Sequence, residues 1–367
     1  MIPIARPQLG PEEESAVLEV MRSGVLAQGK RVKEFEEAFA AAVGAGYAVA
    51  TSNGTTALYL TLIAHDIGPG DEVITTPLTF IATANAIAQT GARPVLADVD
   101  DSLNLDPAAA EELIGPRTRA LMPVHLHGNP ADVLAFQRLA DAHGLVLIQD
   151  ACQAIGAAID GVPLGAFSTA AYSLYATKNI TTGEGGMIVT NDAAVADRCA
   201  SLRHQAYSNT PYVHELIGYN YRMTEMQAAI GLVQLGKLER ITERRRDTAA
   251  YYDRHIKSDL FGRPVIAPET RHVYHQYTLR VRRMDELDRD SVRLQLEAAG
   301  VGSGVYYPVP VHKQPAYAKH ENPPCPNAER ACAEILSIPV HPAVTDADRE
   351  QVAAAVNALV AAVALTP

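Results

Sequence analysis

Strand-length apolar runs alternate with helical patterns from about residue 47 to residue 190, and this alternation constrains the fold more than any other feature. Parallel strands need a crossover connection between them, and a helix is the usual crossover. The alternation therefore predicts an α/β fold, with a mostly parallel central sheet sandwiched by helices. The expected strands are Tyr47–Ala50, Glu72–Thr75, Pro94–Ala97, Ala120–Val124, Val146–Ile148, Ala171–Leu174 and Met187–Thr190.

Two of the expected helices have clear boundaries. Residues 30–43 carry apolar side chains at helical spacing, and glycines follow them as a stop. A second helix is expected over Asn129–His143, with Asn129 as the cap, Pro130 in the first turn and Asp132 as a first-turn acid.

A second, smaller α+β domain is expected after a long charged helical stretch over residues 222–257. It should contain a strand at Gln276–Val281, a helix at Ser291–Ala299 and a last helix at Asp346–Val363. We therefore divide the chain into a large domain over residues 1–245, whose arm is residues 1–29, and a small C-terminal domain over residues 246–367.

Composition narrows the possible partners. The 367 residues hold 31 Lys and Arg against 42 Asp and Glu, a net charge of −11 that disfavours binding to nucleic acid. Neither a signal-peptide pattern nor an apolar run of about twenty residues is present, so we expect no membrane association. The four cysteines show no zinc-ligand spacing, and a reducing cytoplasm is the simplest location.

Ligands in open α/β sheets bind beyond the carboxyl ends of the strands, so polar residues there are candidates for the site. In TSNGTTAL, Gly54 permits close approach of backbone and Thr55 adds a hydroxyl at a helix N-terminus, which suits a phosphate. A tight strand–helix turn with no ligand is the alternative for this segment taken alone.

Two further strand ends carry an acid and an amine. Asp150 follows an apolar strand directly, either as a ligand contact or as a helix N-cap. In SLYATKNITTGEGG, Ser173 ends a strand and Lys178 follows in an apolar, glycine-flanked segment. A lone lysine is usually solvated, but this setting favours a desolvated, reactive amine.

The three segments together fit pyridoxal 5'-phosphate. Its phosphate needs an anion cradle, its aldehyde needs a lysine amine, and its pyridine nitrogen needs a carboxylate to stay protonated. Phe80, after another strand, is placed to stack on the ring.

The chain resembles the DegT/DnrJ/EryC1/StrS sugar aminotransferase family, a group of fold-type I, pyridoxal-phosphate-dependent enzymes. The resemblance covers roughly residues 5–342. It is carried by the strings SNGTTAL, GPGDEVITTPLTFIATANAI, DACQAIGA, SLYATKNITTGEGG, GYNYRMTEMQAAIG, YYPVPVHKQPAY and SIPVHP.

The resemblance implies roles for these residues. Lys178 would form the internal aldimine and shuttle a proton, and Asp150 would hold the pyridinium nitrogen. Other residues would complete the cofactor site: Gly54, Thr55 and Ser173 at the phosphate, Phe80 and Gln153 at the ring, and Asn220 from a second subunit. It also implies a homodimer with shared active sites.

The resemblance further implies a nucleotide-linked keto-sugar as the acceptor and an amino acid, L-glutamate, as the donor, through a pyridoxamine phosphate intermediate. The substrate region would involve the loop Val25–Gly29, Arg222 and the segment Tyr307–Tyr317 with His312. TTGEGG resembles the version seen in 4-keto-sugar enzymes.

Two departures leave the sugar open. Tyr306 replaces the usual His of His-Tyr-Pro, and His127 replaces the usual Tyr of Leu-Tyr-Gly.

Three other functions stay open or are disfavoured. A branch that aminates cyclitol ketones with glutamine as donor stays open, and so does a non-catalytic regulatory protein on the same fold. A dehydratase branch that carries His in place of the lysine is disfavoured by Lys178.

His125 and His127 alternate on a strand without a partnering Cys or acid, so no metal site is expected.

Overall fold

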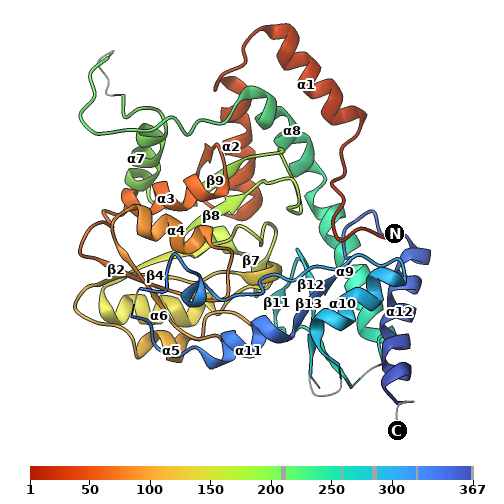
Figure 1. The fold of residues 1–367 in the computed structure, drawn as a ribbon. Helices are drawn as coiled ribbons and strands as arrows, with labels where there is room; N and C mark the ends of the chain where they lie inside the picture. Colours follow the sequence, from red (N-terminus) through yellow and green to blue (C-terminus); the bar gives the residue numbers. More distant parts are fainter. Residues whose placement is uncertain (208–211, 258, 283–286, 320, 365–367) are drawn as a thin grey trace.

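The computed structural model describes residues 1–207, 212–257, 259–282, 287–319 and 321–364, with side chains as far as residue 359. Its centre is a seven-stranded sheet in which every strand except β9 runs in one direction (Figure 1). The predicted α/β class and mostly parallel sheet are confirmed. The strand order is β1 (Tyr47–Thr51), β9 (Gly186–Thr190), β8 (Thr169–Ser173), β5 (Val146–Asp150), β4 (Thr118–Met122), β2 (Glu72–Thr75) and β3 (Arg93–Leu96).

Helices cover both faces of the sheet. Successive strand residues point to opposite faces, so the side chains of each strand enter two separate hydrophobic cores. In β5, Leu147 joins one hydrophobic core and Ile148 the other. The first core includes Phe39 of α2 and Phe136 of α6, and the second includes Ile87 of α4. The covering helices are α2 (Lys30–Val43), α5 (Pro107–Glu111) and α6 (Val133–His143) on one side, and α3 (Gly54–Ala64), α4 (Ala82–Gln89) and α7 (Ala193–Arg203) on the other.

The helix expected from Asn129 begins four residues later. Asn129 is extended, as a residue before proline usually is, and its side chain donates to Val265 O at 3.0 Å. Asp132 is the true N-cap and accepts from Ala135 N at 2.9 Å. The acid predicted for the first turn therefore caps the helix instead.

The expected long helical stretch over residues 222–257 is two helices, α8 (Glu225–Gly236) and α9 (Leu238–His255), which meet at Lys237. Leu238 belongs to a core of the large domain, whereas Tyr252 belongs to the core of the second domain. The predicted boundary at residue 245 lies between these two residues, inside α9, and it stays a prediction. The helix α1 (Pro11–Ser23) packs on α8.

The second domain surrounds a three-stranded antiparallel sheet, in the order β10 (Phe261–Gly262), β12 (Tyr277–Val281) and β13 (Ile335–Ile338). Its helices are α10 (Arg289–Ala298), α11 (Pro326–Glu334) and α12 (Asp346–Ala364). Thr345 and Asp348 form a capping box at the start of α12, with Thr345 N donating to Asp348 Oδ2 at 2.9 Å.

The N-terminal residues join this second domain and not the sheet of the large one. Ile2 bridges to Val301 in parallel fashion and is buried in the second core. Figure 1 shows the N-terminus beside α9 and α12. A small sheet of β6 (Ala158–Ile159), β7 (Val162–Pro163) and β11 (Thr270–Arg271) also ties the two parts of the chain together.

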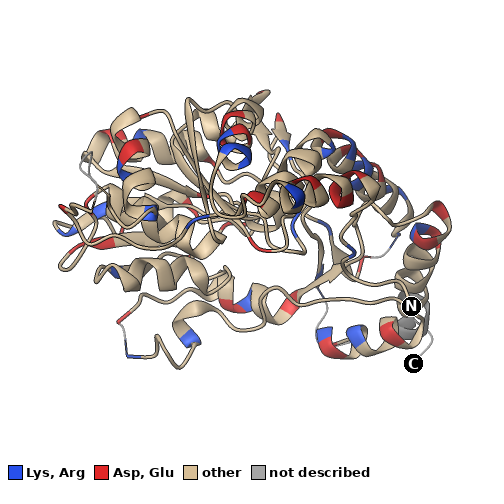
Figure 2. Ribbon diagram, turned by 90° about the horizontal axis from the view of Figure 1, so that it is seen from above, with Lys and Arg blue, Asp and Glu red and all other residues tan. Residues whose placement is uncertain are grey.

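Charged residues of both signs are interspersed over the outer helices (Figure 2). Among the helices of the described chain, none combines the length and the apolar character that a membrane span requires.

Candidate active site

A cavity of about 760 Å³ opens where the carboxyl ends of β5 and β8 face the N-terminus of α3. Strand ends are where an α/β sheet leaves polar groups free for ligands. The sequence-predicted residues that line the cavity are Gly54, Thr55, Phe80, Asp150, Gln153, Ser173, Lys178 and Tyr307.

The N-terminus of α3 offers an anion cradle. Asn53 caps the helix by accepting from Thr56 N at 2.9 Å, which leaves the amides of Gly54 and Thr55 without an acceptor among the described residues. A Cβ on Gly54 would lie 2.8 Å from Ser173 Cβ. The glycine therefore lets these amides stand beside the Ser173 hydroxyl, and helix amides with a hydroxyl suit a phosphate.

Asp150 is buried at the end of β5, and it forms no salt bridge with any residue that the structure describes. Thr83 donates to its Oδ2 at 2.7 Å, and the backbone N–H of Cys152 donates to Oδ1 at 3.1 Å. These two bonds fix the carboxylate at the cavity wall. A buried carboxylate without a salt bridge suits a ligand that brings a positive charge, such as a pyridinium.

Lys178 follows β8 in a loop that is fixed by hydrogen bonds. The Asn179 side chain donates to Val273 O at 2.9 Å, and Lys178 N donates to Tyr175 O at 2.9 Å. Burial lowers the pKa of Lys178, against the opposing effects of Cys152 and Asp150. A lowered pKa raises the fraction of neutral amine, which is the form that attacks a carbonyl.

Gln153 connects the cavity wall to the second domain. Its Oε1 accepts from His127 N at 2.8 Å, and its Nε2 donates to the Tyr307 hydroxyl at 3.3 Å. Phe80 remains 54% exposed at the cavity, and its ring centroid lies 5.9 Å from that of Tyr307. Gln153 therefore holds Tyr307 in the aromatic part of the wall.

The two residues that depart from the family pattern contact each other. His127 Nε2 donates to Tyr306 O at 2.9 Å, and burial lowers the pKa of His127 to about 4. A neutral His127 keeps one ring nitrogen protonated for this bond. The Tyr306 ring lines the cavity, and sequence reasoning did not identify that contact.

Asn220 and Arg222 lie outside the cavity of this single chain. Asn220 is exposed and pairs through its backbone with His204. Arg222 donates to His204 Nδ1 at 2.6 Å, while Tyr221 between them reaches the cavity. The roles of Asn220 and Arg222 stay predictions.

His312 and Tyr317 also lie away from the cavity lining. His312 Nε2 contacts Glu329 Oε1 at 2.9 Å. The buried Tyr317 donates to Asn85 Oδ1 at 2.7 Å within an apolar cluster. Their substrate roles stay predictions as well.

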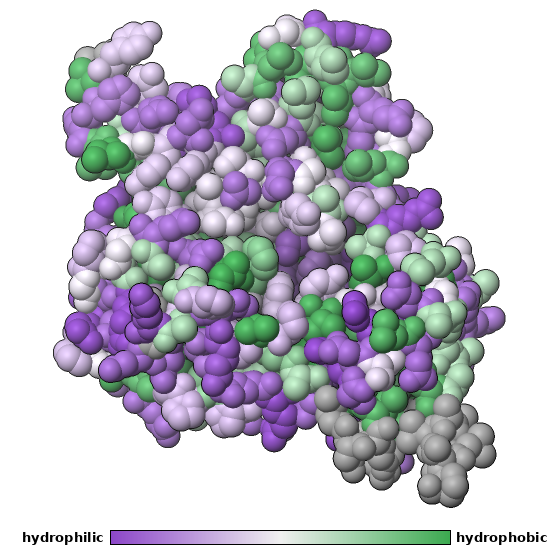
Figure 3. All heavy atoms as spheres, viewed as in Figure 1, coloured by the Kyte–Doolittle hydropathy of each residue, from purple (hydrophilic) through white to green (hydrophobic). Residues whose placement is uncertain are grey.

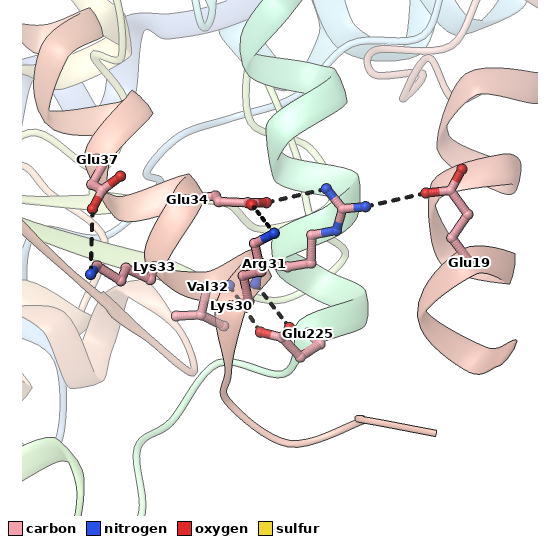
Figure 4. Close-up of polar contacts among 8 residues, drawn as sticks. All are labelled: Glu19, Lys30, Arg31, Val32, Lys33, Glu34, Glu37 and Glu225. Atoms are coloured by element: carbon pink, nitrogen blue, oxygen red, sulfur yellow. Dashed lines mark hydrogen bonds and ion pairs between the residues drawn. The ribbon is translucent and has the colours of Figure 1, made fainter. Parts of the chain in front are cut away.

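The loop Val25–Gly29 ends on the carboxylate of Glu225, which receives Gly29 N at 2.8 Å, Arg31 N at 2.9 Å and Val32 N at 2.9 Å. Figure 4 shows this carboxylate at the start of α2, with the Arg31 side chain between two acids. The start of α8 therefore fixes where this loop ends.

The histidines weighed as metal ligands are engaged by the protein. His125 Nε2 contacts Gln149 Oε1 at 3.0 Å, and its Nδ1 accepts from Ala131 N at 3.0 Å. Within the described ranges, no group of three or more His, Cys, Asp or Glu side chains is arranged to hold a metal ion.

Comparison with known proteins places this geometry in context. The DegT/DnrJ/EryC1/StrS aminotransferase family matches residues 7–357. The chain is 42% identical over 354 residues to a pleiotropic regulatory protein of Geobacillus stearothermophilus, covering 94% of this chain and 93% of that one. It is 40% identical over 362 residues to the GDP-perosamine synthase of Caulobacter vibrioides, covering 97% of each.

A solved structure of another protein has a similar fold. DesV of S. venezuelae, crystallised in complex with a ketimine intermediate, superposes with a TM-score of 0.91 at 41% identity, over 95% of this chain and 94% of that one.

Proposed function

Because this chain belongs to the DegT/DnrJ/EryC1/StrS aminotransferase family, we propose that it transfers the amino group of L-glutamate to a nucleotide-linked keto-sugar. The observation that carries the proposal is the convergence of Gly54, Asp150, Ser173 and Lys178 on one cavity. An anion cradle, a carboxylate without a salt bridge and an amine of lowered pKa are the three features that pyridoxal phosphate requires.

The residues present fit that cofactor. The amides of Gly54 and Thr55 with the Ser173 hydroxyl would bind its phosphate, Asp150 would hold the ring nitrogen, and Lys178 would bind the aldehyde. When bound, pyridoxal phosphate supplies a carbonyl for the amino group and an electron sink for the carbanion formed at the donor.

The chain's own residues would do the remaining work. Lys178 Nζ would take the proton from Cα of the donor, since burial favours its neutral form. Phe80 would cover the ring, and Gln153 would hold Tyr307 against the substrate side. The cavity's partial enclosure between the two domains would limit the access of water to the reacting atoms.

A visible absorption spectrum with and without L-glutamate tests this function. The cofactor's absorption should be present in the purified protein and should change on adding the donor, and Lys178→Ala should abolish turnover. Full turnover in Lys178→Ala would refute the assignment. A spectrum that responds to L-glutamine but not to L-glutamate would instead favour the aminocyclitol reaction.

For the acceptor we favour a 4-keto-6-deoxy sugar. The TTGEGG segment motivates this choice, and its Glu184 lines the cavity. The 40% identity to a GDP-perosamine synthase supports it. GDP-linked and TDP-linked 4-keto-6-deoxyhexoses should each be offered to the enzyme after its reaction with the donor, and return of the original spectrum identifies the acceptor.

We also propose a homodimer. Two projecting parts of the chain carry exposed apolar side chains, and both are visible at the top of Figure 3. Asn220 lies beside one of these parts and away from the cavity of its own chain, as a residue that serves a neighbouring active site should. The exposed side chains are Leu18, Met21, Val25 and Leu26 on one part, and Tyr207, Tyr212, Val213, Leu216 and Ile217 on the other.

The cytoplasm is the location we propose for the enzyme. All four cysteines are free, which suits a reducing compartment. Fractionation of the source cells checks this directly, and recovery outside the cytoplasm would refute it.

A regulatory role without catalysis is the second candidate, because one relative is described as a pleiotropic regulatory protein. It predicts that the cofactor spectrum stays unchanged with every donor and acceptor. The intact set of Asp150, Ser173 and Lys178 around the cavity favours catalysis.

A further inference from the structure

The imidazole of His275 lines the cavity but makes no hydrogen bond to any described residue. The residue is only 7% exposed. Its Nδ1 is fully shielded from solvent, and its Nε2 has no hydrogen-bond partner among the described residues. Buried polar groups are normally paired, so an unpaired imidazole calls for a partner that comes from outside the chain.

The other buried histidines near this cavity make such bonds. His125 uses both ring nitrogens, His127 donates to Tyr306 O, and His272 Nδ1 accepts from Tyr274 N at 2.8 Å. His275 differs from these histidines in two ways. Its side chain lines the cavity, and it makes no hydrogen bond to a described residue.

The backbone around His275 is held firmly. Arg245 Nη1 donates to Tyr274 O at 2.9 Å and to His275 O at 3.3 Å. Asn179, next to Lys178, holds the same segment through Val273 O. The missing side-chain bonds therefore do not reflect a loosely held segment.

Burial lowers the pKa of His275 well below its usual value, and the nearby positive charges of Lys178 and Arg245 lower it further. The ring is therefore neutral and carries one proton. An unpaired buried N–H is unfavourable, so the proton belongs on the nitrogen that a ligand can reach. That nitrogen is Nε2, because Nδ1 is fully shielded.

We propose that Nε2–H of His275 donates a hydrogen bond to an oxygen of the bound keto-sugar, either its carbonyl or a neighbouring hydroxyl. This role rests on the proposed function. A neutral donor matches an uncharged sugar oxygen, whereas the carboxylates of an amino-acid donor call for cations. Gln276, Tyr306 and Tyr307 on the same wall are also uncharged hydrogen-bonding groups, as a surface that recognises hydroxyls requires.

The test separates the two halves of the reaction in His275→Phe and His275→Gln. The Phe side chain fills the space without a polar atom, and the Gln amide places an N–H near the original Nε2. In both variants the amine transfer from L-glutamate to the cofactor, followed by absorbance, should remain near the wild-type rate.

The second half, started with a GDP-linked 4-keto-6-deoxyhexose or its TDP-linked counterpart, should need a substrate concentration on the order of tenfold to a hundredfold higher in His275→Phe. His275→Gln should recover most of that loss. Equal slowing of both halves, or a Gln variant no better than Phe, would overturn the role. A wild-type protein inert toward every donor would instead refute the proposed function itself.

Discussion

The hydroxyl of Thr83 donates to Asp150 Oδ2 at 2.7 Å, so a residue of α4 orients the carboxylate that ends β5. Thr79 lies 2.8 Å from Thr83 through their hydroxyl oxygens and continues the chain of hydroxyls. The position of the Asp150 carboxylate therefore depends on a helix that contributes neither the amine nor the phosphate cradle.

Replacing Thr83 by Val should weaken cofactor binding. The change removes a hydrogen bond to a charged acceptor and keeps the volume of the side chain, and such a bond is worth about 1.5–3 kcal/mol, on the order of tenfold or more in affinity. Titration of the apoprotein with pyridoxal phosphate measures the effect. Thr83→Ser keeps the hydroxyl and should bind nearly as tightly as wild type. Unchanged affinity in Thr83→Val would show that this bond does not support the cofactor.

Replacing Gly54 by Ala should also reduce cofactor affinity, for a steric reason. The new Cβ would lie 2.8 Å from Ser173 Cβ and 3.1 Å from Cys152 Sγ, so the helix terminus and the serine must move apart. Overpacking of this kind costs about 1–3 kcal/mol. Gly115→Ala is the matched control because nothing lies within 4 Å of its added Cβ. The same titration, with circular dichroism for the fold, compares the two, and equal affinities would contradict the cradle.

Replacing Glu225 by Gln should destabilise the fold. Both oxygens of its buried carboxylate accept from backbone N–H groups at the start of α2, and Gln replaces one of these oxygens by an NH2 group that cannot accept. We expect the free energy of unfolding to fall by about 1–3 kcal/mol.

The control for that measurement is Glu37→Gln in α2, the helix whose start contacts Glu225. Glu37 is paired with Lys33 at 3.9 Å, and the two side chains are 68% and 78% exposed, so the change should stay within about 0.5 kcal/mol. Urea unfolding of both variants and of the wild type measures the two changes in the free energy of unfolding. A Glu225→Gln protein as stable as Glu37→Gln would mean that the carboxylate is not needed at this helix start.

Stability should fall on acidification because of buried neutral histidines. Burial lowers the pKa of His125 from 6.5 to about 4. Between these values the unfolded chain binds a proton that the folded chain does not, so stability is lost as the pH falls from 6.5 towards 4 and is unaffected above 6.5.

His125→Asn keeps an acceptor for Ala131 N and removes the titrating group. Urea unfolding at about pH 7 and about pH 5 should show a smaller loss in this variant than in wild type. An equal loss in both proteins would mean that His125 does not contribute to the acid sensitivity.

The groups that converge on the cavity could be predicted where their position follows from a strand end. Asp150, Ser173 and Lys178 follow or end strands whose apolar runs are plain in the sequence, and parallel strands bring their carboxyl ends to one edge. Thr83 and His275 could not be found this way, because their places depend on how a helix and the second domain pack against that edge.

The residues expected at the substrate illustrate the same limit. Asn220 and Arg222 lie outside the cavity of their own chain, so the roles predicted for them depend on the proposed second chain, which no spacing rule describes. The break between α8 and α9 at Lys237 does not follow from the sequence pattern either, because the apolar residues before it and the charged residues after it are mostly good helix formers.

The pairing of Ile2 with Val301 has a consequence for biosynthesis. During translation Ile2 leaves the ribosome long before Val301 exists, while the strands of the central sheet, which all lie before residue 191, can already associate. The second domain cannot close its core until ribosomal synthesis has passed the partner of Ile2.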